Sequence, residues 1–253
     1  MYGQEILDIS AKRAFIISDF DGTLSPIVSE PLNAEFEVDA VATLVDLSFR
    51  FKTVAILSGR SSDFILSKAA VSSAYMDGFK DQIKIFGLYG NENLKEDLRL
   101  TEAVADIARE LDSQFSNAVL VENKLISVTV HYRNNANKKR VIGESIDSVL
   151  SNYREFTVIP AKMSYEVVPK IFKKKGDVIT DLLKSHDGGY YLGDDVGDLD
   201  AFKALKMQPS KATCSVAVRS TDTPQDVINA ADISVGSTKE AVKFLKKLKA
   251  EFE

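Results

Sequence analysis

The sequence predicts an α/β protein in which a doubly wound, Rossmann-like parallel sheet is interrupted by a smaller α+β insert. In both terminal parts of the chain, short apolar runs alternate with segments of helical periodicity, a pattern typical of parallel sheets covered by helices on both faces. Between them, over about 95–168, strand-like segments alternate apolar and polar residues, as in antiparallel sheets. After Lys170 the first pattern returns.

The N-terminal part supplies the first strands and helices of the expected sheet. We expect strands over 14–18, 53–57 and 82–90, and helices over 36–51 and 61–71. The first helix is supported by apolar residues at helical spacing, namely Val38, Val41, Leu44 and Val45. Ser61 or Ser62 is the expected N-cap of the second helix.

The insert is expected to consist of two hairpins and two helices. The helices fall within 100–115 and 134–153, and the strands within 118–124, 125–133, 156–161 and 164–170. A turn is expected around Asn123–Lys124. In the strand over 125–133, Ile126, Val128, Val130 and Tyr132 alternate with Ser127, Thr129, His131 and Arg133, which predicts one buried and one exposed face. The predicted division is an inserted domain over 95–168 and a core domain built from 1–94 and 169–253.

The C-terminal part completes the parallel sheet. We expect helices over 175–186, 198–205 and 238–252, and strands over 189–195, 213–218 and 232–235. Ligands of doubly wound sheets bind beyond the carboxyl ends of the strands. Polar and charged residues that directly follow the predicted strands are therefore the candidates for a functional site.

The composition excludes several classes of function. The net charge of −5 and the pI of about 5.3 disfavour nucleic-acid binding. We expect no transmembrane helix, because no run of eighteen or more apolar residues occurs. Cys214 is the single cysteine, so no intrachain disulfide forms, and the N-terminus lacks a signal-peptide pattern. We expect a cytoplasmic protein, and a monomer, since no long apolar stripe is left without a place in the fold.

The first candidate site is the acid pair in FIISDFDGTLSP, residues 15–26. Asp19 and Asp21 follow a buried strand, and continued strand geometry would place both side chains on one side. Gly22 then allows the chain to turn. Two close carboxylates can share a divalent metal, or act as nucleophile and general acid. The alternative interpretation is an Asp-Gly turn with both acids solvated.

Three further signals follow other predicted strands or begin helices. GDDVGD places Asp194, Asp195 and Asp198 at another strand end. Five carboxylates at one sheet edge would repel each other without a cation, and oxygen ligands without a Cys/His cluster favour Mg²⁺ over zinc. Ser58 ends a strand before a helix, where a hydroxyl can contact phosphate or form part of a helix cap. Lys175 begins a helix, although KKK is also compatible with a solvated basic run.

In this order, DFDGTLSPI, LSGR, KKKGDVI and GDDVGD resemble the four motifs of the haloacid dehalogenase superfamily of phosphatases. The insert between the second and third motifs is similar to the C2-type cap domain of that superfamily. GLYGNE, VENK, VTVHYR and YEVVP narrow the resemblance to the trehalose-6-phosphate phosphatases. This resemblance implies Mg²⁺-dependent hydrolysis of trehalose 6-phosphate.

The resemblance also implies a role for each site residue. Asp19 would be the nucleophile that forms an aspartyl-phosphate, and Asp21 the general acid and base. Asp19, Asp194 and the carbonyl of Asp21 would hold Mg²⁺, helped by Lys175. Asp198 would orient Lys175 or the metal shell, and Asp195 is a possible ligand without an assigned place. Phosphate and substrate would contact Ser58, Gly59 and Arg60. The sugar-binding residues of the cap would be Glu122, Lys124, Arg133 and Glu166, although a solvated hairpin end also accounts for Glu122 and Lys124, and an outer-face strand position for Arg133.

The chain departs from the family pattern at three positions. Gly197 and Leu199 stand where the family usually has threonine and glutamate, and Tyr89 stands where it usually has histidine. These departures keep a second hypothesis open, a phosphatase for another sugar phosphate, such as a glucosylglycerol, sucrose 6-phosphate or phosphoglycerate-linked substrate. A catalytically silent sugar-phosphate-binding domain is a third hypothesis. The presence of both Asp19 and Asp21 argues against it, because a silent site needs neither.

Overall fold

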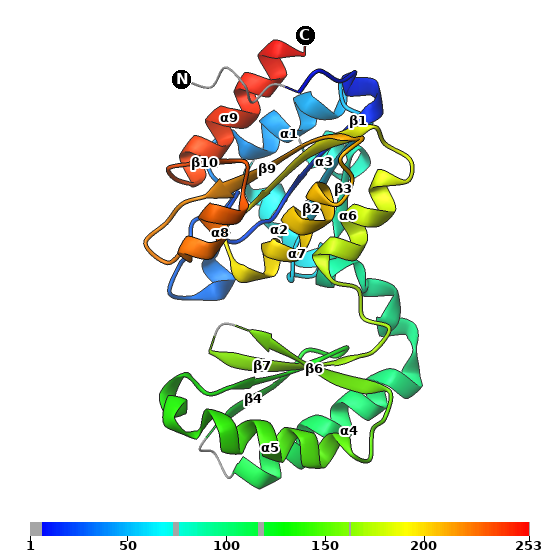
Figure 1. Ribbon diagram of the computed structural model, residues 1–253, viewed down its shortest axis with the longest axis vertical. Coiled ribbons are helices and arrows are strands. Elements are labelled where there is room, and N and C mark those ends of the chain that lie inside the picture. The colour runs from blue at the N-terminus through cyan, green and yellow to red at the C-terminus, as the bar shows by residue number, and fades with distance from the viewer. Residues whose placement is uncertain (1–6, 73–75, 116–118, 162, 253) are drawn as a thin grey trace. The chain divides into compact units, whose positions relative to one another are not determined.

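The chain forms two compact units in the computed structural model, which describes residues 7–72, 76–115, 119–161 and 163–252 (Figure 1). Unit 1 comprises Met1–Gly90 and Lys173–Glu253, and unit 2 comprises Asn91–Phe172. These limits differ by a few residues from the domain limits predicted from the sequence.

Unit 1 contains a six-stranded, all-parallel sheet in the order β10-β9-β8-β1-β2-β3. Its strands are β1 (Ala14–Ser18), β2 (Thr53–Leu57), β3 (Ile83–Phe86), β8 (Gly188–Gly193), β9 (Ala212–Val218) and β10 (Ile233–Val235). From β1 the chain proceeds to β2 and β3 on one side, and after unit 2 it proceeds from β8 to β9 and β10 on the other. The topological switch point of this doubly wound sheet therefore lies between β1 and β8.

Helices cover both faces of this sheet, as the sequence predicts (Figure 1). One face carries α1 (Ala40–Ser48), α2 (Ser62–Ser72), α3 (Met76–Gln82) and α9 (Thr238–Glu251). The other carries α6 (Lys175–Leu183), α7 (Leu199–Lys206) and α8 (Gln225–Ala230). The short helices α3 and α8 were not predicted.

The 3₁₀-helices of the two units are η1 (Ala11–Arg13), η2 (Pro31–Asn33), η3 (Gly87–Gly90), η4 (Glu92–Glu96), η5 (Arg133–Lys138) and η6 (Val196–Asp198).

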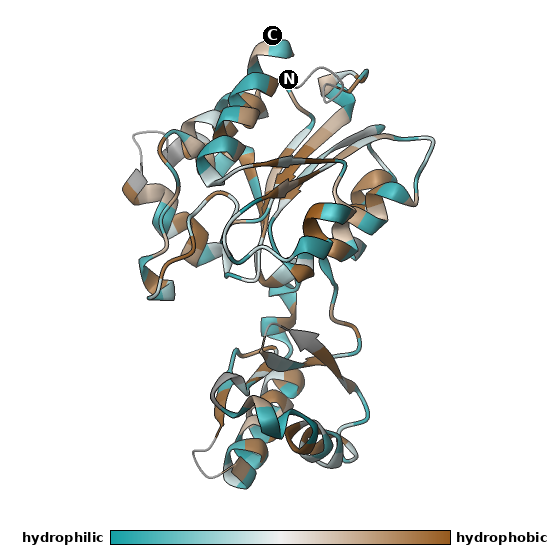
Figure 2. Ribbon diagram, turned by 60° about the vertical axis from the view of Figure 1, so that its left-hand side comes forward, coloured by the Kyte–Doolittle hydropathy of each residue, from teal (hydrophilic) through white to brown (hydrophobic). Residues whose placement is uncertain are grey.

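The central strands are apolar throughout because both of their faces are covered. In β1, Ala14 and Ile16 contact the α1 and α9 side, while Phe15 and Ile17 contact the α6 and α7 side. The strands of this sheet are mostly hydrophobic in Figure 2, whereas the surrounding helices contain both hydrophilic and hydrophobic residues. The predicted role of Val38 in the first helix is wrong, because left-handed Asp39 (φ 67°) precedes the helix and leaves Val38 80% exposed.

Unit 2 contains a four-stranded antiparallel sheet in the order β4-β5-β7-β6. Its strands are β4 (Leu120–Asn123), β5 (Val128–His131), β6 (Phe156–Ala161) and β7 (Ser164–Pro169), and its helices are α4 (Leu98–Phe115) and α5 (Lys139–Leu150). Apolar side chains of both helices share a core with Val128, Val130 and Val167. This is the α+β insert that the sequence predicts.

The prediction of an exposed second face for the strand over 125–133 is wrong at Ser127 and Thr129, whereas His131 is partly exposed. Ser127, which precedes β5, and Thr129 are each 3% exposed, and Thr129 lies between its cross-strand neighbours Glu122 of β4 and Glu166 of β7. The Ser127 hydroxyl donates a hydrogen bond to Glu166 Oε1 at 3.0 Å. The strand also begins later than predicted, since Lys124 N–H donates to the Ser127 carbonyl at 2.9 Å across the turn. Among the described residues, no helix combines the length and apolarity needed to cross a membrane.

Candidate active site

The switch point brings two predicted acids to one edge of the sheet. Asp19 directly follows β1 and Asp194 directly follows β8, and these strands are parallel neighbours. The pairing extends past the strand end, because Asp19 N–H donates to the Leu192 carbonyl at 2.9 Å. Carboxyl ends of neighbouring parallel strands meet at one edge, so acids far apart in sequence become neighbours here.

A tight turn follows Asp19. The Phe20 carbonyl accepts hydrogen bonds from three successive N–H groups, those of Thr23, Leu24 and Ser25. Gly22 has φ +75°, a conformation that L side chains rarely adopt, and a Cβ there would overlap the carboxylate of Asp194. Glycine is therefore required twice over, for the turn and for the close approach of Asp194 to the backbone.

The turn gives Asp19 and Asp21 different partners. Extended geometry ends at β1, so the alternation that would place both side chains on one side does not continue. The Asp21 carboxylate accepts hydrogen bonds from Arg60 Nε at 2.8 Å and Nη2 at 3.0 Å. Asp19 Oδ2 instead accepts from Lys175 Nζ at 2.6 Å. Arg60, which was predicted to bind substrate, is thus paired with Asp21, the acid two residues after the predicted nucleophile Asp19.

Lys175 lies between two buried carboxylates. Its ammonium is 2.6 Å from Asp19 Oδ2 and 2.6 Å from Asp198 Oδ1, and the residue is 4% exposed. A solvated basic run therefore describes Lys173 and Lys174, which are exposed, and not Lys175. Burial acts to lower the pKa of Lys175, but the charges of Asp19 and Asp198 outweigh it and hold the pKa well above the usual value. The two carboxylates therefore favour the charged form of the lysine.

Asp198 is fully buried and connects three parts of the site. Its Oδ1 accepts from Lys175 Nζ and from the Tyr191 hydroxyl, each at 2.6 Å. Its Oδ2 accepts the N–H groups of Asp194 at 2.8 Å and Asp195 at 3.0 Å. Since both oxygens already have two donors, this carboxylate is placed to orient its neighbours. Asp195 is exposed, and its carboxylate accepts from Gly197 N–H at 2.7 Å.

Ser58 and Gly59 lie at the carboxyl end of β2. Ser58 is 1% exposed, and its hydroxyl oxygen accepts from Arg60 N–H at 3.2 Å. Its carbonyl accepts from Tyr89 N–H at 2.8 Å. A Cβ at Gly59 would lie 2.6 Å from the Tyr89 hydroxyl, so Gly59 makes room for that ring. Tyr89, one of the departures from the family pattern, has φ 58°. Lys175 Nζ lies over its ring, 5.9 Å from the ring centroid.

Two residues of this network were missed by the sequence analysis, Tyr191 and Thr23. The Thr23 hydroxyl donates to Asp194 Oδ1 at 3.3 Å. The signal for Tyr191 was its position in a wholly buried strand, because a buried phenol requires a hydrogen-bond partner. The signal for Thr23 was weaker, since threonine is common in turns.

The two acids at the switch point are unusually difficult to ionise. Burial raises the pKa of Asp194 to about 8, reinforced by the charges of Asp19 and Asp198. Burial also raises the pKa of Asp19 to about 7; Lys175 opposes this shift and Asp198 adds to it. Both residues are 7% exposed. Buried like charges of this kind are stabilised by a cation.

The donor atoms fit a hard divalent cation. Every candidate ligand is a carboxylate or carbonyl oxygen, and carboxylate oxygens of Asp19, Asp195 and Asp198 lie within 4.8 Å of one another. Asp198 is the least suited of these, because all four of its hydrogen-bonding positions are used. Asp194, held against Gly22 beside Asp19, is the more available carboxylate. The acidic cluster is thus compatible with a divalent metal.

Without a divalent metal, the free energy of unfolding is expected to fall as pH rises from about 6.5 to 8. Asp19 and Asp194 have folded pKa values of about 7 and 8 against 3.8 for the unfolded chain. The folded protein therefore retains protons that the unfolded chain has released, which removes up to about 1.4 kcal/mol per pH unit for each retained proton. Below pH 6.5 the lowered pKa of His186 acts in the opposite direction.

The measurement is the unfolding temperature in chelator at pH 6.5, 7.2 and 8. Asp194→Asn should flatten the dependence, and added Mg²⁺ should raise the unfolding temperature most at pH 8, where both carboxylates ionise. An unfolding temperature that rises across this window in the metal-free wild type would contradict the pKa shifts.

The predicted sugar-binding residues lie on unit 2. Thr129 of β5 pairs directly with Glu122 of β4 and Glu166 of β7, so the three side chains share one face of the sheet. Glu122 Oε2 lies 3.1 Å from His131 Nε2 and 3.9 Å from Lys124 Nζ. The Thr129 hydroxyl is buried and has no hydrogen-bond partner among the described residues.

Arg133 does not continue the strand as predicted. The strand β5 ends at His131, and Arg133 begins η5. Its side chain lies outside the part of the chain that the structure describes.

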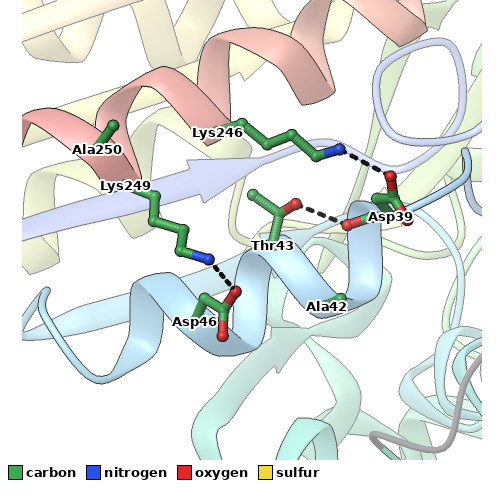
Figure 3. A pocket seen from close by; sticks show the side chains of 7 residues that line it. All are labelled: Asp39, Ala42, Thr43, Asp46, Lys246, Lys249 and Ala250. Carbon is green, nitrogen blue, oxygen red and sulfur yellow. Dashed lines mark hydrogen bonds and ion pairs between the residues drawn. The ribbon is translucent and has the colours of Figure 1, made fainter.

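A separate pocket of about 330 Å³ lies between α1 and α9 (Figure 3). Its lining consists of Asp39, Ala42, Thr43, Asp46, Lys246, Lys249 and Ala250. Lys246 pairs with Asp39 at 2.7 Å and Lys249 with Asp46 at 2.6 Å, as the dashed lines show. Each cation is thus matched by a carboxylate of the same pocket, and no predicted site residue lines it. The strand ends remain the candidate site.

The family model and the curated relatives that match this chain point to the same family. The sequence model of the trehalose-phosphatase family matches residues 17–237. Trehalose-phosphate phosphatase B of Arabidopsis thaliana is 31% identical over 230 residues, covering 81% of this chain and 60% of the relative. Trehalose-phosphate phosphatase of Mycobacterium avium is 30% identical over 257 residues, covering 97% and 64%. The chain therefore spans less than two thirds of the length of these curated relatives.

Solved structures share the fold. A trehalose-6-phosphate phosphatase of Aspergillus fumigatus aligns with a TM-score of 0.69 at 22% identity, covering 94% of this chain and 93% of that one. A haloacid dehalogenase-like hydrolase from Bacteroides thetaiotaomicron aligns with a TM-score of 0.62 at 15% identity, covering 93% and 99%. At these identities the comparison establishes the haloacid dehalogenase-like fold, with its parallel sheet and separate antiparallel sheet.

Proposed function

The chain belongs to the trehalose-phosphatase family, and we propose from this that it hydrolyses trehalose 6-phosphate to trehalose and phosphate, a step of trehalose biosynthesis. The structural observation that supports the phosphatase chemistry is the buried network at the switch point. There Lys175 bridges Asp19 and Asp198 at 2.6 Å each, beside Asp194. A buried cation held against a buried carboxylate is an arrangement suited to attack on an anionic ester.

Asp19 acts as the nucleophile and forms an aspartyl-phosphate. Attack by a carboxylate on a phosphate ester brings two anions together. At about 4 Å and an effective dielectric constant near 20, two unit charges repel by roughly 4 kcal/mol, which corresponds to a rate factor on the order of a thousand. Lys175 reduces this repulsion, because its ammonium is hydrogen-bonded to the nucleophile and the neighbouring carboxylates raise its pKa well above the usual value.

Asp21 acts as general acid toward the departing sugar oxygen and then as base toward the water that hydrolyses the intermediate. Its bidentate bond to Arg60 fixes the orientation of the carboxylate. The Ser58 hydroxyl accepts the Arg60 N–H, and a hydroxyl that accepts can still donate its own proton, here to a phosphoryl oxygen. Gly59 allows this segment to lie against Tyr89.

We propose Mg²⁺ as the divalent cation, held by Asp19, Asp194 and the carbonyl oxygen of Asp21. Bound there, it supplies positive charge that offsets the phosphate charge. The raised pKa values of Asp19 and Asp194 support a cation at these residues, because they show how unfavourable it is to leave both ionised without one.

Unit 2 is proposed to be the cap that recognises the sugar, through Glu122, Lys124, Arg133 and Glu166. Sugar hydroxyls require both donors and acceptors, and these side chains provide both. The unpartnered Thr129 hydroxyl between Glu122 and Glu166 adds a polar group on the same face. A buried polar group left unpaired by the wrong sugar costs about 1–3 kcal/mol, which gives the cap a means of discrimination.

A phosphatase for another sugar phosphate is the second candidate, favoured by the departures at Gly197, Leu199 and Tyr89. Tyr89 is the most relevant of these, since its ring faces Lys175. A catalytically silent domain is disfavoured by the buried charges, because a protein without catalysis has no reason to keep Lys175, Asp19 and Asp198 desolvated together.

The test is phosphate release from trehalose 6-phosphate beside glucose 6-phosphate, sucrose 6-phosphate and glucosylglycerol phosphate, each with Mg²⁺ or with chelator. We expect Mg²⁺-dependent release, with kcat/KM for trehalose 6-phosphate about a hundredfold above the other substrates. Preference for another sugar phosphate would keep the core chemistry and reject the assignment of the cap residues. Release from none of them would make the silent domain the better hypothesis.

Other predictions remain expectations. The cytoplasmic location, the monomeric state and the absence of nucleic-acid partners are still predictions from the sequence.

A further inference from the structure

One buried titratable group at the site has no role in the mechanism above. Tyr191 of β8 is fully buried on the α6 and α7 side of the sheet, where its ring meets Phe202 edge to face at 5.9 Å. Its hydroxyl donates a 2.6 Å hydrogen bond to Asp198 Oδ1, the oxygen that also accepts from Lys175. Burial, with the charge of Asp198, holds the pKa of Tyr191 well above its usual value, so the phenol remains a donor.

We propose that Tyr191 is a positioning residue for phosphoryl transfer, which fixes Asp198 so that Lys175 stays against the nucleophile Asp19. The inference rests on the proposed phosphatase function and extends it by one residue. Tyr191 does not itself contact the reacting groups. It acts through Asp198 and Lys175.

The geometry of Asp198 explains why one phenol matters. Two backbone N–H groups hold Oδ2, whereas Oδ1 is held by Lys175 and Tyr191. Without the phenol, the lysine would be the only donor to Oδ1 in this set. A carboxylate with one fewer donor also attracts the ammonium more strongly. Lys175 would then shift toward Asp198 and away from Asp19.

The neighbouring residue provides a matched control. Tyr190 is also fully buried, in the same strand, but its side chain lies on the α1 and α9 side of the sheet. Its hydroxyl accepts a hydrogen bond from Leu7 N–H at 2.9 Å, and its ring meets Phe244 at 5.9 Å. The two tyrosines thus match in burial, strand and aromatic packing, and differ in whether the hydroxyl reaches Asp198.

The experiment compares Tyr191→Phe with Tyr190→Phe in the full chain. Tyr191→Phe is expected to lower kcat about tenfold to a hundredfold, the range for one hydrogen bond to a charged group, with KM for the sugar phosphate changed less than about twofold. Tyr190→Phe should leave kcat within about twofold of wild type. Unfolding temperatures of both variants identify any loss that is merely structural.

Two further measurements separate positioning from general damage. In an Asp198→Asn background, Tyr191→Phe should lower kcat by no more than about twofold, because the group it acts through is altered. Binding of beryllium fluoride, a phosphoryl mimic, in the presence of Mg²⁺ should weaken about tenfold in Tyr191→Phe and stay unchanged in Tyr190→Phe. This binding is measured by calorimetry and requires no sugar substrate.

The outcomes distinguish this inference from the proposed function. Equal effects of the two tyrosine substitutions, or an undiminished effect of Tyr191→Phe in the Asp198→Asn background, would overturn the role of Tyr191 while leaving the phosphatase intact. A wild-type protein that neither releases phosphate nor binds beryllium fluoride would overturn the proposed function, and this inference with it.

Discussion

Replacing Asp19 with asparagine is expected to abolish phosphate release, lowering kcat by about a thousandfold or more. An amide cannot serve as the nucleophile that forms an acyl phosphate, and Asp21 is held by Arg60, so it cannot take over. Stability should be preserved in the absence of metal. The pKa of Asp19 is raised from 3.8 to about 7, so at pH 8 the ionised carboxylate lowers the free energy of unfolding relative to an unperturbed aspartate, and a neutral isostere removes that cost.

Steady-state phosphate release measures the loss, and mass spectrometry after acid quench should find a phosphoryl group on the peptide that contains Asp19 in wild type alone. Asp46→Asn is a suitable control, because Asp46 is a carboxylate in the pocket between α1 and α9, paired with Lys249 and remote from the strand ends. Retention of a tenth of the activity in Asp19→Asn would exclude Asp19 as the nucleophile.

Replacing Lys175 with methionine is expected to affect both activity and stability. Methionine fills a similar volume but leaves Asp19 and Asp198 buried without their shared cation. Breaking a buried ion pair in this way costs about 3–5 kcal/mol of unfolding free energy. Because the substitution also removes the charge that offsets repulsion between nucleophile and phosphate, kcat should fall by about a hundredfold or more.

The adjacent residue supplies the control for this substitution. Lys174 is exposed and lies 3.8 Å from an exposed carboxylate, that of Asp200, so Lys174→Met should change unfolding free energy by less than about 1 kcal/mol. Chemical denaturation and phosphate release are measured on both variants. Similar losses in the two would mean that the basic run acts as a whole and that the buried position of Lys175 has no special part.

Much of the site could be predicted because its residues directly follow strands. A wholly apolar run predicts a buried strand, and the edge where such strands end is where ligands bind, so Asp19, Ser58 and Asp194 were recognisable. The alternation of short strands and helices also predicted that these strand ends lie at one edge of a parallel sheet. These inferences need only the local pattern and the topology of a parallel sheet.

What could not be predicted depends on side-chain direction after the strand ends. The turn at Gly22 sends Asp21 toward Arg60, which no periodicity in the sequence indicates. The burial of Thr129 on the polar face of β5 depends on neighbours contributed by β4 and β7. The role of Tyr191 was not predicted, because a phenol in an apolar run has the same pattern whether its hydroxyl meets a backbone group or a carboxylate.

The pairing of β1 with β8 also determines when during synthesis the site can exist. Lys175 is separated from Asp19 by 156 residues, and the whole of unit 2, residues 91–172, lies between them in the chain. A continuous unit of this kind can fold while the rest of the polypeptide is still being made. Once unit 2 is folded, β1 and β8 are no longer joined through a long flexible loop, which lowers the entropy cost of bringing the two strands together. During translation, β1, β2 and β3 are therefore made before β8, their partner in the centre of the sheet. Asp19 and Lys175 can come into contact only after unit 2 has left the ribosome.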